Sequence, residues 1–468
     1  MLIKNAWLQG RPVDVRVGAT VEAIAPQLNA MRNESVLDAG GGEILPGLHD
    51  HHIHLFAAAA VQGSVSCNVG GGSLARCREV LAERLANAPG SGWIRGVDYH
   101  EQQLGELDRW RLDELCSHRP LRIQHRSGKL WVCNSIAVQA LDLGAFTHLN
   151  GVQCDASGQL TGCVVRNDEL MAQQLDAIGA GSMPDIAAFS RQLASFGIVS
   201  VTDTSATNTQ KSAVDLQRLR ADGALLQQIS LMGDDTLDHG YLKVLLDEDR
   251  LPALQTLIAR INAARSRGRN IAFHCVTHLE LVFALAALAE ATPIEQGFDR
   301  IEHGAVIDDA MADELAARNL PVITQPGFLY SKGDQYRADL PQQELECLYR
   351  YAGLRARGVK VVPSSDAPYG PVSPWQNIAT AACRRSAGGL SLGADECVSS
   401  DQALTGYLTA SALLDQSPTL AQVQEVRLGM RGDLCILQKR WEQGRDRPET
   451  VGVRATLIGG SVAFDGAD

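Results

Sequence analysis

Short apolar runs recur along the middle of the chain and alternate with amphipathic stretches, the pattern of a parallel sheet with crossover helices. Eight runs can be counted, and eight parallel strands close a (β/α)8 barrel of the TIM type. The strand candidates are 44–54, 198–203, 227–232, 241–246, 271–274, 299–303, 321–324 and 359–364. Helical stretches fall between most of them, at 251–265, 279–291 and 310–318. The pattern therefore predicts an α/β fold built on such a barrel.

One connection is too short for this pattern. Between Met232 and Gly240 there is less chain than the dozen or so residues that a parallel crossover usually takes. Either the helix there is vestigial or one of the two neighbouring strands is misassigned.

Both ends of the chain show short strand-like runs separated by glycine turns. The candidates are 1–8, 13–17 and 21–25 at the start and 434–437, 451–458 and 461–464 at the end. Gly459 and Gly460 form a hairpin turn between the last two. We predict that the termini, 1–43 and 425–468, pair into one small β-sandwich beside a barrel domain at 44–424.

Residues 57–195 do not fit a single βα unit and indicate a large insertion after the first barrel strand. They carry helices near 74–86 and 132–141, strands near 93–97 and 121–125, and a hairpin at 152–164. Such an insertion would stand over the mouth of the barrel, where catalytic loops gather. A subdomain that covers the substrate is the favoured interpretation, and a decorative or oligomerising insertion is the alternative.

Histidines gather at the end of the first strand candidate, Leu45-Pro-Gly-Leu-His-Asp-His-His-Ile-His54. Residues two apart on a strand share a face, so His52 and His54 aim at one point while His49 and His51 are bystanders. Two converging imidazoles are half of a transition-metal site. Taken alone, a His-x-His pair favours a loop tag or a surface histidine cluster, so the motif needs partners further along the chain.

Four more potential ligands stand within or just past later strand candidates: Lys243, His274, His303 and Asp366. A barrel keeps its active site at the carboxyl ends of its strands, so all of them would face one cavity with the first pair. Lys243 lies in an apolar strand, where an ammonium group is expensive to bury unless it is paired or neutralised. A lysine that reacts with carbon dioxide becomes a carbamate, an anionic ligand that can bridge two metals.

The ordered motifs resemble the amidohydrolase superfamily, and within it the amidohydrolase-3 group of N-substituted formamide deformylases and D-aminoacylase-like enzymes. The resemblance spans nearly the full chain, including residues 125–135 of the insertion. The matching motifs are Pro-Gly-Leu-His-Asp-His-His-Ile-His (46–54), Gly-Ile-Val-Ser-Val-Thr-Asp (197–203), Leu-Lys-Val-Leu-Leu-Asp (242–247), Ile-Ala-Phe-His (271–274), Ile-Glu-His-Gly (301–304) and Ser-Ser-Asp-Ala-Pro (364–368).

The resemblance implies a centre of divalent metal, zinc above all. It assigns one ion to the first two histidines and a second ion to the next two, with a carboxylated lysine bridging them. Asp366 would bind the first ion and serve as general base and then general acid. A single ion is the alternative, because many superfamily members use only one. The implied ligands are His52, His54, Lys243, His274, His303 and Asp366.

The favoured function is metal-dependent hydrolysis of a C–N bond, in an amide or an N-acyl or N-formyl compound, outside peptides (class EC 3.5). The alternative is an aminohydrolase that deaminates a heterocyclic amine or cyclic amidine. Thr277 counts against it, because related deaminases place a glutamate at that position. A catalytically silent scaffold would have lost metal ligands, and none is missing.

Six residues are candidates for substrate binding, because they stand in the insertion motif or in loops after the last two barrel strands. Arg126 or Lys129 would recognise an anionic group, and the aromatic residues would stack on a ring. The candidates are His125, Arg126, Lys129, Trp131, Tyr330 and Tyr369.

The resemblance implies a small-molecule substrate, and composition argues against other kinds of partner. The net charge of −12 argues against nucleic acid or an anionic membrane surface. No signal peptide or apolar run of about 18 residues is visible. The 11 cysteines are scattered without CxxC spacing, typical of a reduced, cytoplasmic protein. A homodimer stays open.

Overall fold

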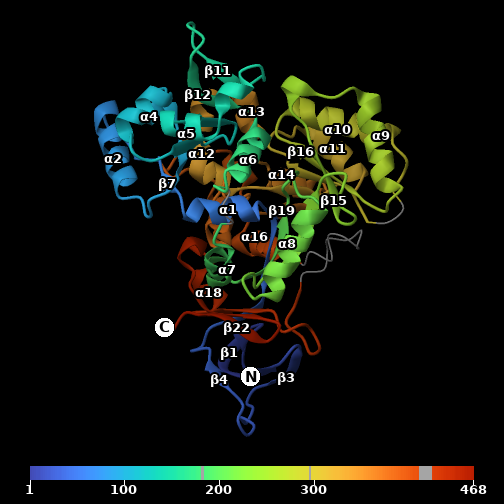
Figure 1. Cartoon of the computed structure of the whole chain (residues 1–468). Coiled ribbons are helices and arrows are strands. Elements are labelled where there is room, and N and C mark those ends of the chain that lie inside the picture. The colour runs from blue at the N-terminus through green and yellow to red at the C-terminus, as the bar shows by residue number, and fades with distance from the viewer. Residues whose placement is uncertain (181–183, 295–296, 410–423, 468) are drawn as a thin grey trace. The chain divides into compact units, whose positions relative to one another are not determined.

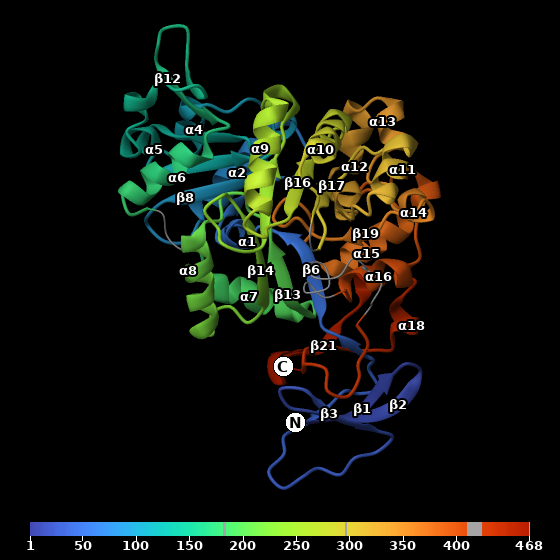
Figure 2. The same ribbon diagram turned by 90° about the vertical axis from the view of Figure 1, so that its right-hand side faces the viewer.

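The computed structural model describes residues 1–180, 184–294, 297–409 and 424–467 (Figures 1 and 2). Its contacts divide the chain into two compact units. The first unit joins Met1–Leu55 to Ala187–Asp468, and the second unit is Phe56–Ile186.

An eight-stranded parallel sheet forms the centre of the first unit, as predicted. Two backbone bonds link its last strand segment to its first: Asp366 N donates to His52 O (2.8 Å) and His54 N donates to Ala367 O (2.9 Å). Figure 2 shows the first three strands beside one another. In sheet order the strands are β6 (Leu48–Ile53), β13 (Ile198–Asp203), β14 (Gln228–Gly233), β15 (Tyr241–Leu245), β16 (Ile271–Cys275), β17 (Arg300–His303), β18 (Val322–Thr324) and β19 (Val361–Pro363).

Helices connect most of these strands, and several begin at side-chain caps. Thr209 and Thr277 each accept a hydrogen bond from a backbone N–H of the first helical turn, in reciprocal capping boxes. The longer helices are α7 (Ile186–Ser195), α8 (Gln210–Ala221), α9 (Leu254–Arg265), α10 (His278–Glu290), α11 (Asp309–Ala317), α12 (Gly327–Asp339), α15 (Pro374–Cys383) and α16 (Ser400–Tyr407). Shorter ones are α13 (Gln342–Glu346), α14 (Ala352–Ala356) and α18 (Trp441–Gly444).

The short connection between β14 and β15 contains no helix, and both strands are real. They pair in parallel at Met232↔Tyr241 and Gly233↔Leu242. The buried guanidinium of Arg269 replaces the helix as an anchor, donating to the carbonyls of Asp234 (2.8 Å), Gly240 (3.1 Å) and Tyr241 (2.9 Å). Of the two alternatives, the vestigial crossover is therefore the correct one.

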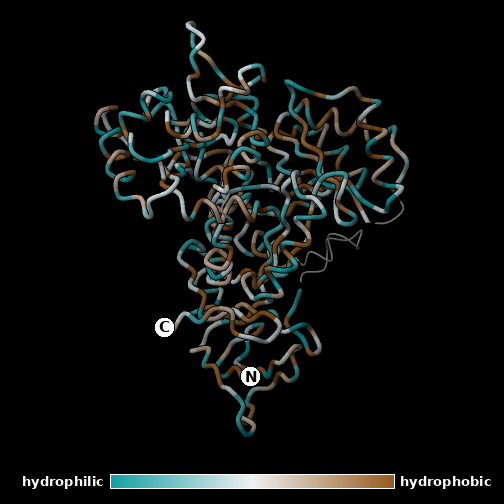
Figure 3. Tube along the Cα trace, viewed as in Figure 1, coloured by the Kyte–Doolittle hydropathy of each residue, from teal (hydrophilic) through white to brown (hydrophobic). Residues whose placement is uncertain are grey.

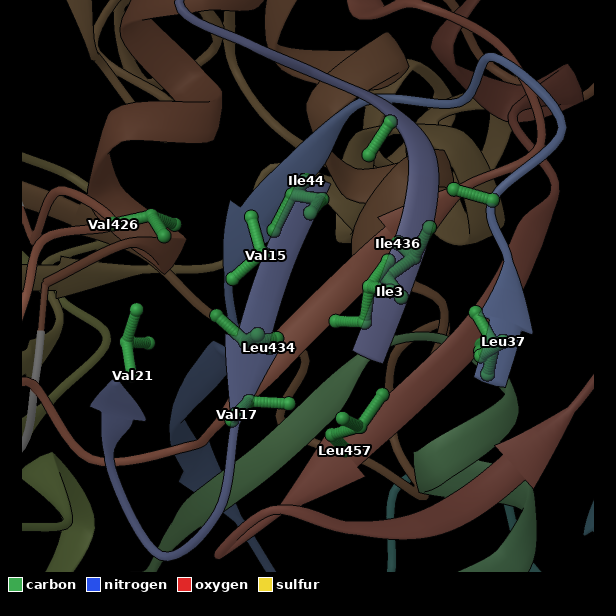
Figure 4. Close-up of a cluster of buried hydrophobic side chains, with 13 residues drawn as sticks. Ile3, Val15, Val17, Val21, Leu37, Ile44, Val426, Leu434, Ile436 and Leu457 are labelled. Atoms are coloured by element: carbon green, nitrogen blue, oxygen red, sulfur yellow. The ribbon is translucent and has the colours of Figure 1, made fainter. Parts of the chain in front are cut away.

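The two ends of the chain form a pair of four-stranded sheets that pack on each other. Figure 1 places both termini in this layer, and Figure 3 shows hydrophobic stretches within it. In Figure 4 the N-terminal and C-terminal strands point apolar side chains at one another, among them Ile3, Val15, Leu434 and Ile436. One sheet is β3 (Val21–Ala25), β2 (Arg11–Val17), β1 (Leu2–Leu8) and β4 (Val36–Asp38); the other is β22 (Ser461–Asp465), β21 (Val453–Ile458), β20 (Leu434–Leu437) and β5 (Ile44–Pro46).

The predicted first barrel strand, 44–54, is divided at Gly47. Its first part, β5, pairs with β20 of the terminal sheets, and only β6 enters the barrel. A Cβ atom at Gly47 would lie 2.3 Å from a methyl carbon of Val199. Only glycine therefore lets the chain pass between the two sheets here.

The second unit is built on a six-stranded sheet with apolar clusters that include Ile123 and Leu170. The predicted helix at 132–141 begins late, because Val132 and Cys133 pair in a strand and Asn134 caps the helix that follows. In sheet order the strands are β11 (Val152–Cys154), β12 (Leu160–Val165), β10 (Leu130–Cys133), β9 (Leu121–His125), β8 (Ile94–Tyr99) and β7 (Val65–Ser66). The helices are α1 (Leu55–Gln62), α2 (Leu74–Ala86), α3 (Glu101–Leu104), α4 (Arg109–Leu115), α5 (Ser135–Ala140) and α6 (Asp168–Ala177).

The predicted domain boundaries and the lid role of 57–195 stay predictions. All 11 cysteines are free, as expected from their spacing. No described helix is both long and apolar enough to cross a membrane. The cytoplasmic location and the homodimer also stay predictions.

Gly47→Ala is expected to lower the free energy of unfolding by about 1–3 kcal/mol, because the added methyl group overlaps Val199. Urea titration measures the change. Gly71→Ala is the matched control, since a Cβ atom there meets nothing within 4 Å. Equal stability of the two variants would contradict the steric account.

His49 provides a second test, through pH. Its ring nitrogens lie 2.7 Å from Ser200 Oγ and 2.9 Å from Thr202 Oγ1, and burial, helped by Arg300, lowers its pKa to about 3. The unfolded histidine titrates near 6.5, so the unfolded state binds the extra proton first as the pH falls. Between pH 7 and pH 5 this group should therefore cost ~2 kcal/mol of stability.

Urea unfolding at both pH values measures that loss. His49→Gln should lose less stability than the wild type over the same interval, whatever its stability at pH 7. The exposed His278→Gln should behave like the wild type. The same pH dependence in all three proteins would exclude a neutral buried His49.

Candidate metal centre

Two imidazoles at the carboxyl end of β6, those of His52 and His54, each turn one nitrogen toward the carboxylate of Asp366. His52 Nδ1 donates to Glu302 Oε2 (2.5 Å), and His54 Nδ1 lies 3.0 Å from Ser205 Oγ. With those atoms held, the Nε2 atoms of His52 and His54 lie 3.4 Å and 3.2 Å from Asp366 Oδ1. The donation to Glu302 leaves the lone pair of His52 on Nε2, the atom that faces Asp366.

Asp366 follows β19 and is fixed by its backbone. Its N–H donates to His52 O at 2.8 Å, which ties the carboxylate to the strand that carries the histidines. Its φ of 52° lies in the left-handed region, where a residue with a side chain is strained. Oδ1 of this carboxylate is buried and has no hydrogen-bond partner among the described residues.

A second pair of imidazoles lies beside the first. His303 Nε2 and His274 Nδ1 are 2.9 Å apart, while His303 Nδ1 faces Gln325 Oε1 at 2.9 Å. His303 Nδ1 is also 3.7 Å from Asp366 Oδ2, and its φ is 68°. Burial lowers the pKa of His303 well below its usual value, and the neighbouring imidazoles act in the same direction. A neutral ring can use a nitrogen lone pair as a ligand.

Lys243 stands in the middle of β15 with its side chain buried. Its Nζ has no hydrogen-bond partner in the described part of the chain. Burial lowers the pKa of the amine, although Glu302 and Asp366 raise it. The charge of the lysine also helps to lower the pKa of His52 and of His303, after the larger effect of burial.

These groups fit a divalent cation. The ligand atoms of His52, His54 and Asp366 all lie within 4.8 Å of one another. Three buried polar atoms, His52 Nε2, Asp366 Oδ1 and Lys243 Nζ, have no hydrogen-bond partner among the residues described. Burying unsatisfied polar atoms costs free energy, and imidazole with carboxylate is a donor set that zinc accepts.

A buried ion pair between Arg300 and Glu302 contacts this donor set through His52. Arg300 donates to Glu302 through Nε (2.5 Å) and Nη2 (3.1 Å), and Nη2 also donates to His51 O (2.9 Å). Burial alone would raise the pKa of Glu302, but Arg300 and Lys243 bring it below its ordinary value. Glu302 therefore stays ionised and accepts a hydrogen bond from His52 Nδ1.

The sequence did not point to Ser205, Gln325 or Glu302 as residues that orient the imidazoles. Glu302 both accepts from His52 and pairs with Arg300. Ser205 and Gln325 follow the ends of β13 and β18, so their strand-end positions were a usable signal. Asp50, which precedes these histidines in the motif, accepts from the backbone N–H groups of His52 (3.3 Å) and Ser365 (3.1 Å).

The remaining histidines of the motif lie outside this donor set. His49 bonds to two hydroxyl groups of β13, and His51 Nε2 donates to Gly406 O at 3.0 Å. His278 begins α10 with its side chain half exposed, 3.8 Å from Asp308.

The substrate candidates of the first unit differ in position. The ring of Tyr369 stands edge-on to His54, with centroids 5.6 Å apart. Tyr330 lies exposed on α12.

The other four candidates lie in the second unit, so their part in substrate binding stays a prediction. His125 is held between Glu101 (2.9 Å) and Ser127 (2.7 Å). Trp131 is buried and donates to Asp168 at 2.6 Å. The side chains of Arg126 and Lys129 make no hydrogen bond or ion pair within the described residues.

Known proteins resemble this chain over nearly its full length. An N-substituted formamide deformylase of Arthrobacter pascens is 25% identical over 88% of this chain and 86% of its own. An uncharacterized metal-dependent hydrolase of Pyrococcus horikoshii shares the fold, with a TM-score of 0.70 and 18% identity over 94% of this chain and 97% of its own. An N-isopropylammelide isopropylaminohydrolase of Burkholderia multivorans has a TM-score of 0.55 at 15% identity, over 98% and 97%. The sequence model of the Amidohydrolase family matches residues 35–464, and the chain belongs to that family.

Proposed function

We propose that this protein is a metal-dependent hydrolase that cleaves the C–N bond of a small N-acyl or N-formyl compound. The observation that carries the proposal is the convergence of two imidazole Nε2 atoms on Asp366 Oδ1, 3.4 Å and 3.2 Å away, beside the buried amine of Lys243. Membership of the Amidohydrolase family supports hydrolysis of such bonds.

His52, His54 and Asp366 would hold one divalent cation, with zinc as the expected metal. A bound cation supplies Lewis-acid polarisation of the carbonyl and lowers the pKa of water to about 7. His274 and His303 would hold a second ion, because their facing nitrogens are 2.9 Å apart. A single ion on the first three ligands is the simpler alternative.

Lys243 would bridge the two sites as a carbamate. The neutral amine is the form that adds to carbon dioxide, and burial favours that form by lowering the pKa of Lys243. In that reaction Nζ attacks the carbon of carbon dioxide and loses one proton. The product has two oxygen ligands where the unmodified amine has no hydrogen-bond partner among the described residues.

Asp366 would move the proton of the reaction. Its carboxylate takes one proton from the attacking water, whose oxygen bonds to the carbonyl carbon. As the C–N bond breaks, the same carboxyl group gives that proton to the leaving nitrogen. The φ of 52° at Asp366 and its backbone bond to His52 keep Oδ1 aimed at the histidines through both transfers.

Deamination of a heterocyclic amine is the second candidate that the sequence left open. In related deaminases a glutamate stands where this chain has Thr277. Here Thr277 caps α10 through its hydroxyl group, and Glu280, three residues later, accepts from the N–H of Thr277 (3.0 Å). That arrangement supports a structural role for both residues and favours amide hydrolysis.

Asp366→Asn is expected to lower kcat at least about 100-fold, because it removes the proton-transferring group. The assay is amine release from a panel of N-formyl and N-acyl amines, with ammonia release from heterocyclic amines scored in parallel. Metal content is measured for both proteins. No amine release by the metal-loaded wild type, or full activity of the variant, would refute the proposal.

Glu302→Gln should weaken the affinity for zinc about 10–100-fold, because a neutral amide holds the Nδ1 proton of His52 less firmly. Competition with a chromophoric chelator measures the affinity without reference to catalysis. Glu314→Gln, a surface glutamate paired with Arg318 on α11, is the control and should keep wild-type affinity. Unchanged affinity in Glu302→Gln would show that the Arg300–Glu302 pair serves the fold alone.

A further inference from the structure

Two arginines stand side by side on one face of the sheet in the second unit. Arg95 of β8 and Arg122 of β9 are direct partners in the parallel register, so their side chains leave the sheet on the same side. Both guanidinium groups lie over the indole of Trp131, at 5.5 Å and 5.4 Å from the ring centroid. Cation–π attraction to the indole ring helps to hold both guanidinium groups in place.

Arg122 keeps its charge without a counter-charge. Its side chain is half-buried, and its buried Nε has no hydrogen-bond partner among the residues described. The described chain also shows no ion pair at this guanidinium. Burial lowers the pKa of Arg122 to about 10, and the charge of Arg95 acts in the same direction.

Two polar side chains beside this cluster, Asp168 and Gln124, accept hydrogen bonds from residues other than Arg122. Asp168 accepts from Trp131 Nε1 at 2.6 Å, and its charge is felt by Arg95. Gln124 accepts from Arg95 Nη2 at 3.0 Å. Neither contact reaches Arg122.

Such an arrangement is costly for the fold and suited to a ligand. A half-buried cation without a partner is unfavourable for the folded protein, and a second cation beside it adds repulsion. A bound oxyanion would give Arg122 a partner and would reduce the repulsion between the two cations. The planar guanidinium group matches two oxygens of a carboxylate or phosphate.

We propose that Arg122 and Arg95, stacked on Trp131, form a binding site for the carboxylate or phosphate group of a small molecule. The inference goes beyond the proposed hydrolysis and concerns the second unit alone. It also moves anion recognition from Arg126 and Lys129, the residues favoured on sequence, to two strand residues that the sheet register places together.

Titration calorimetry on the full-length, metal-loaded protein tests the site. Inorganic phosphate and succinate are the probes, each at constant ionic strength, and the tighter of the two identifies the group. The wild type should bind at least one probe saturably. Arg122→Gln should weaken that binding at least about tenfold, because a charge-assisted hydrogen bond is lost.

Arg111→Gln is the matched control, an exposed arginine of the same unit that pairs with Glu114 at 3.4 Å. It should bind like the wild type. Binding that Arg122→Gln leaves unchanged would belong to the metal centre and would overturn the proposal. Absence of saturable binding of both probes by the wild type would overturn it too.

A thermal readout covers the case in which a variant is poorly folded. The bound probe should raise the Tm of the wild type and of Arg111→Gln. Arg122→Lys keeps the charge but loses the fork, so its Tm shift should be smaller yet present. A shift as large in Arg122→Lys and Arg122→Gln as in the wild type would overturn the role of the guanidinium.

Discussion

The buried ion pair between Arg300 and Glu302 is the interaction on which the carboxyl end of the barrel strands depends. Two charges inside a barrel are tolerable only if each finds partners. Arg300 bonds to both oxygens of Glu302 and to His51 O, so the pair is locked to the backbone of β6. The same carboxylate accepts the hydrogen bond of His52 Nδ1, and the orientation of His52 Nε2 toward Asp366 follows from that bond.

Two residues on the other side of the proposed site have strained backbone conformations. His303 and Asp366 both have a positive φ, at 68° and 52°. The surrounding structure holds their backbones there, through the bond from Asp366 N to His52 O and the pairing of His303 with Cys275 in the sheet. Strain of this kind persists only where neighbours over-determine the backbone, and it is concentrated at functional sites. Rigid strand ends thus bring donors from several strands to one point.

One segment of chain, 44–53, belongs partly to the terminal sheets and partly to the barrel, and Gly47 separates the two parts. β5 belongs to the terminal sheets and β6 to the barrel, so the strand that carries His52 and His54 is anchored at its start by β20. Strand periodicity predicted one continuous strand here. The division could not be predicted, because β5 and β6 pair with different strands, β20 and β13, which only the folded chain brings beside them.

The sequence by itself determined the eight barrel strands, since β-branched runs separated by helical stretches have few other solutions. It also determined which histidines share the end of β6, because side chains alternate along a strand. Only the tertiary structure decided which ring nitrogen of each histidine forms a hydrogen bond to a neighbouring side chain. Ser205, Glu302 and Gln325 set the ring orientations from other strands, and the cross-strand register places Arg95 beside Arg122. Such contacts join residues far apart in the chain, and spacing along a sequence carries no information about them.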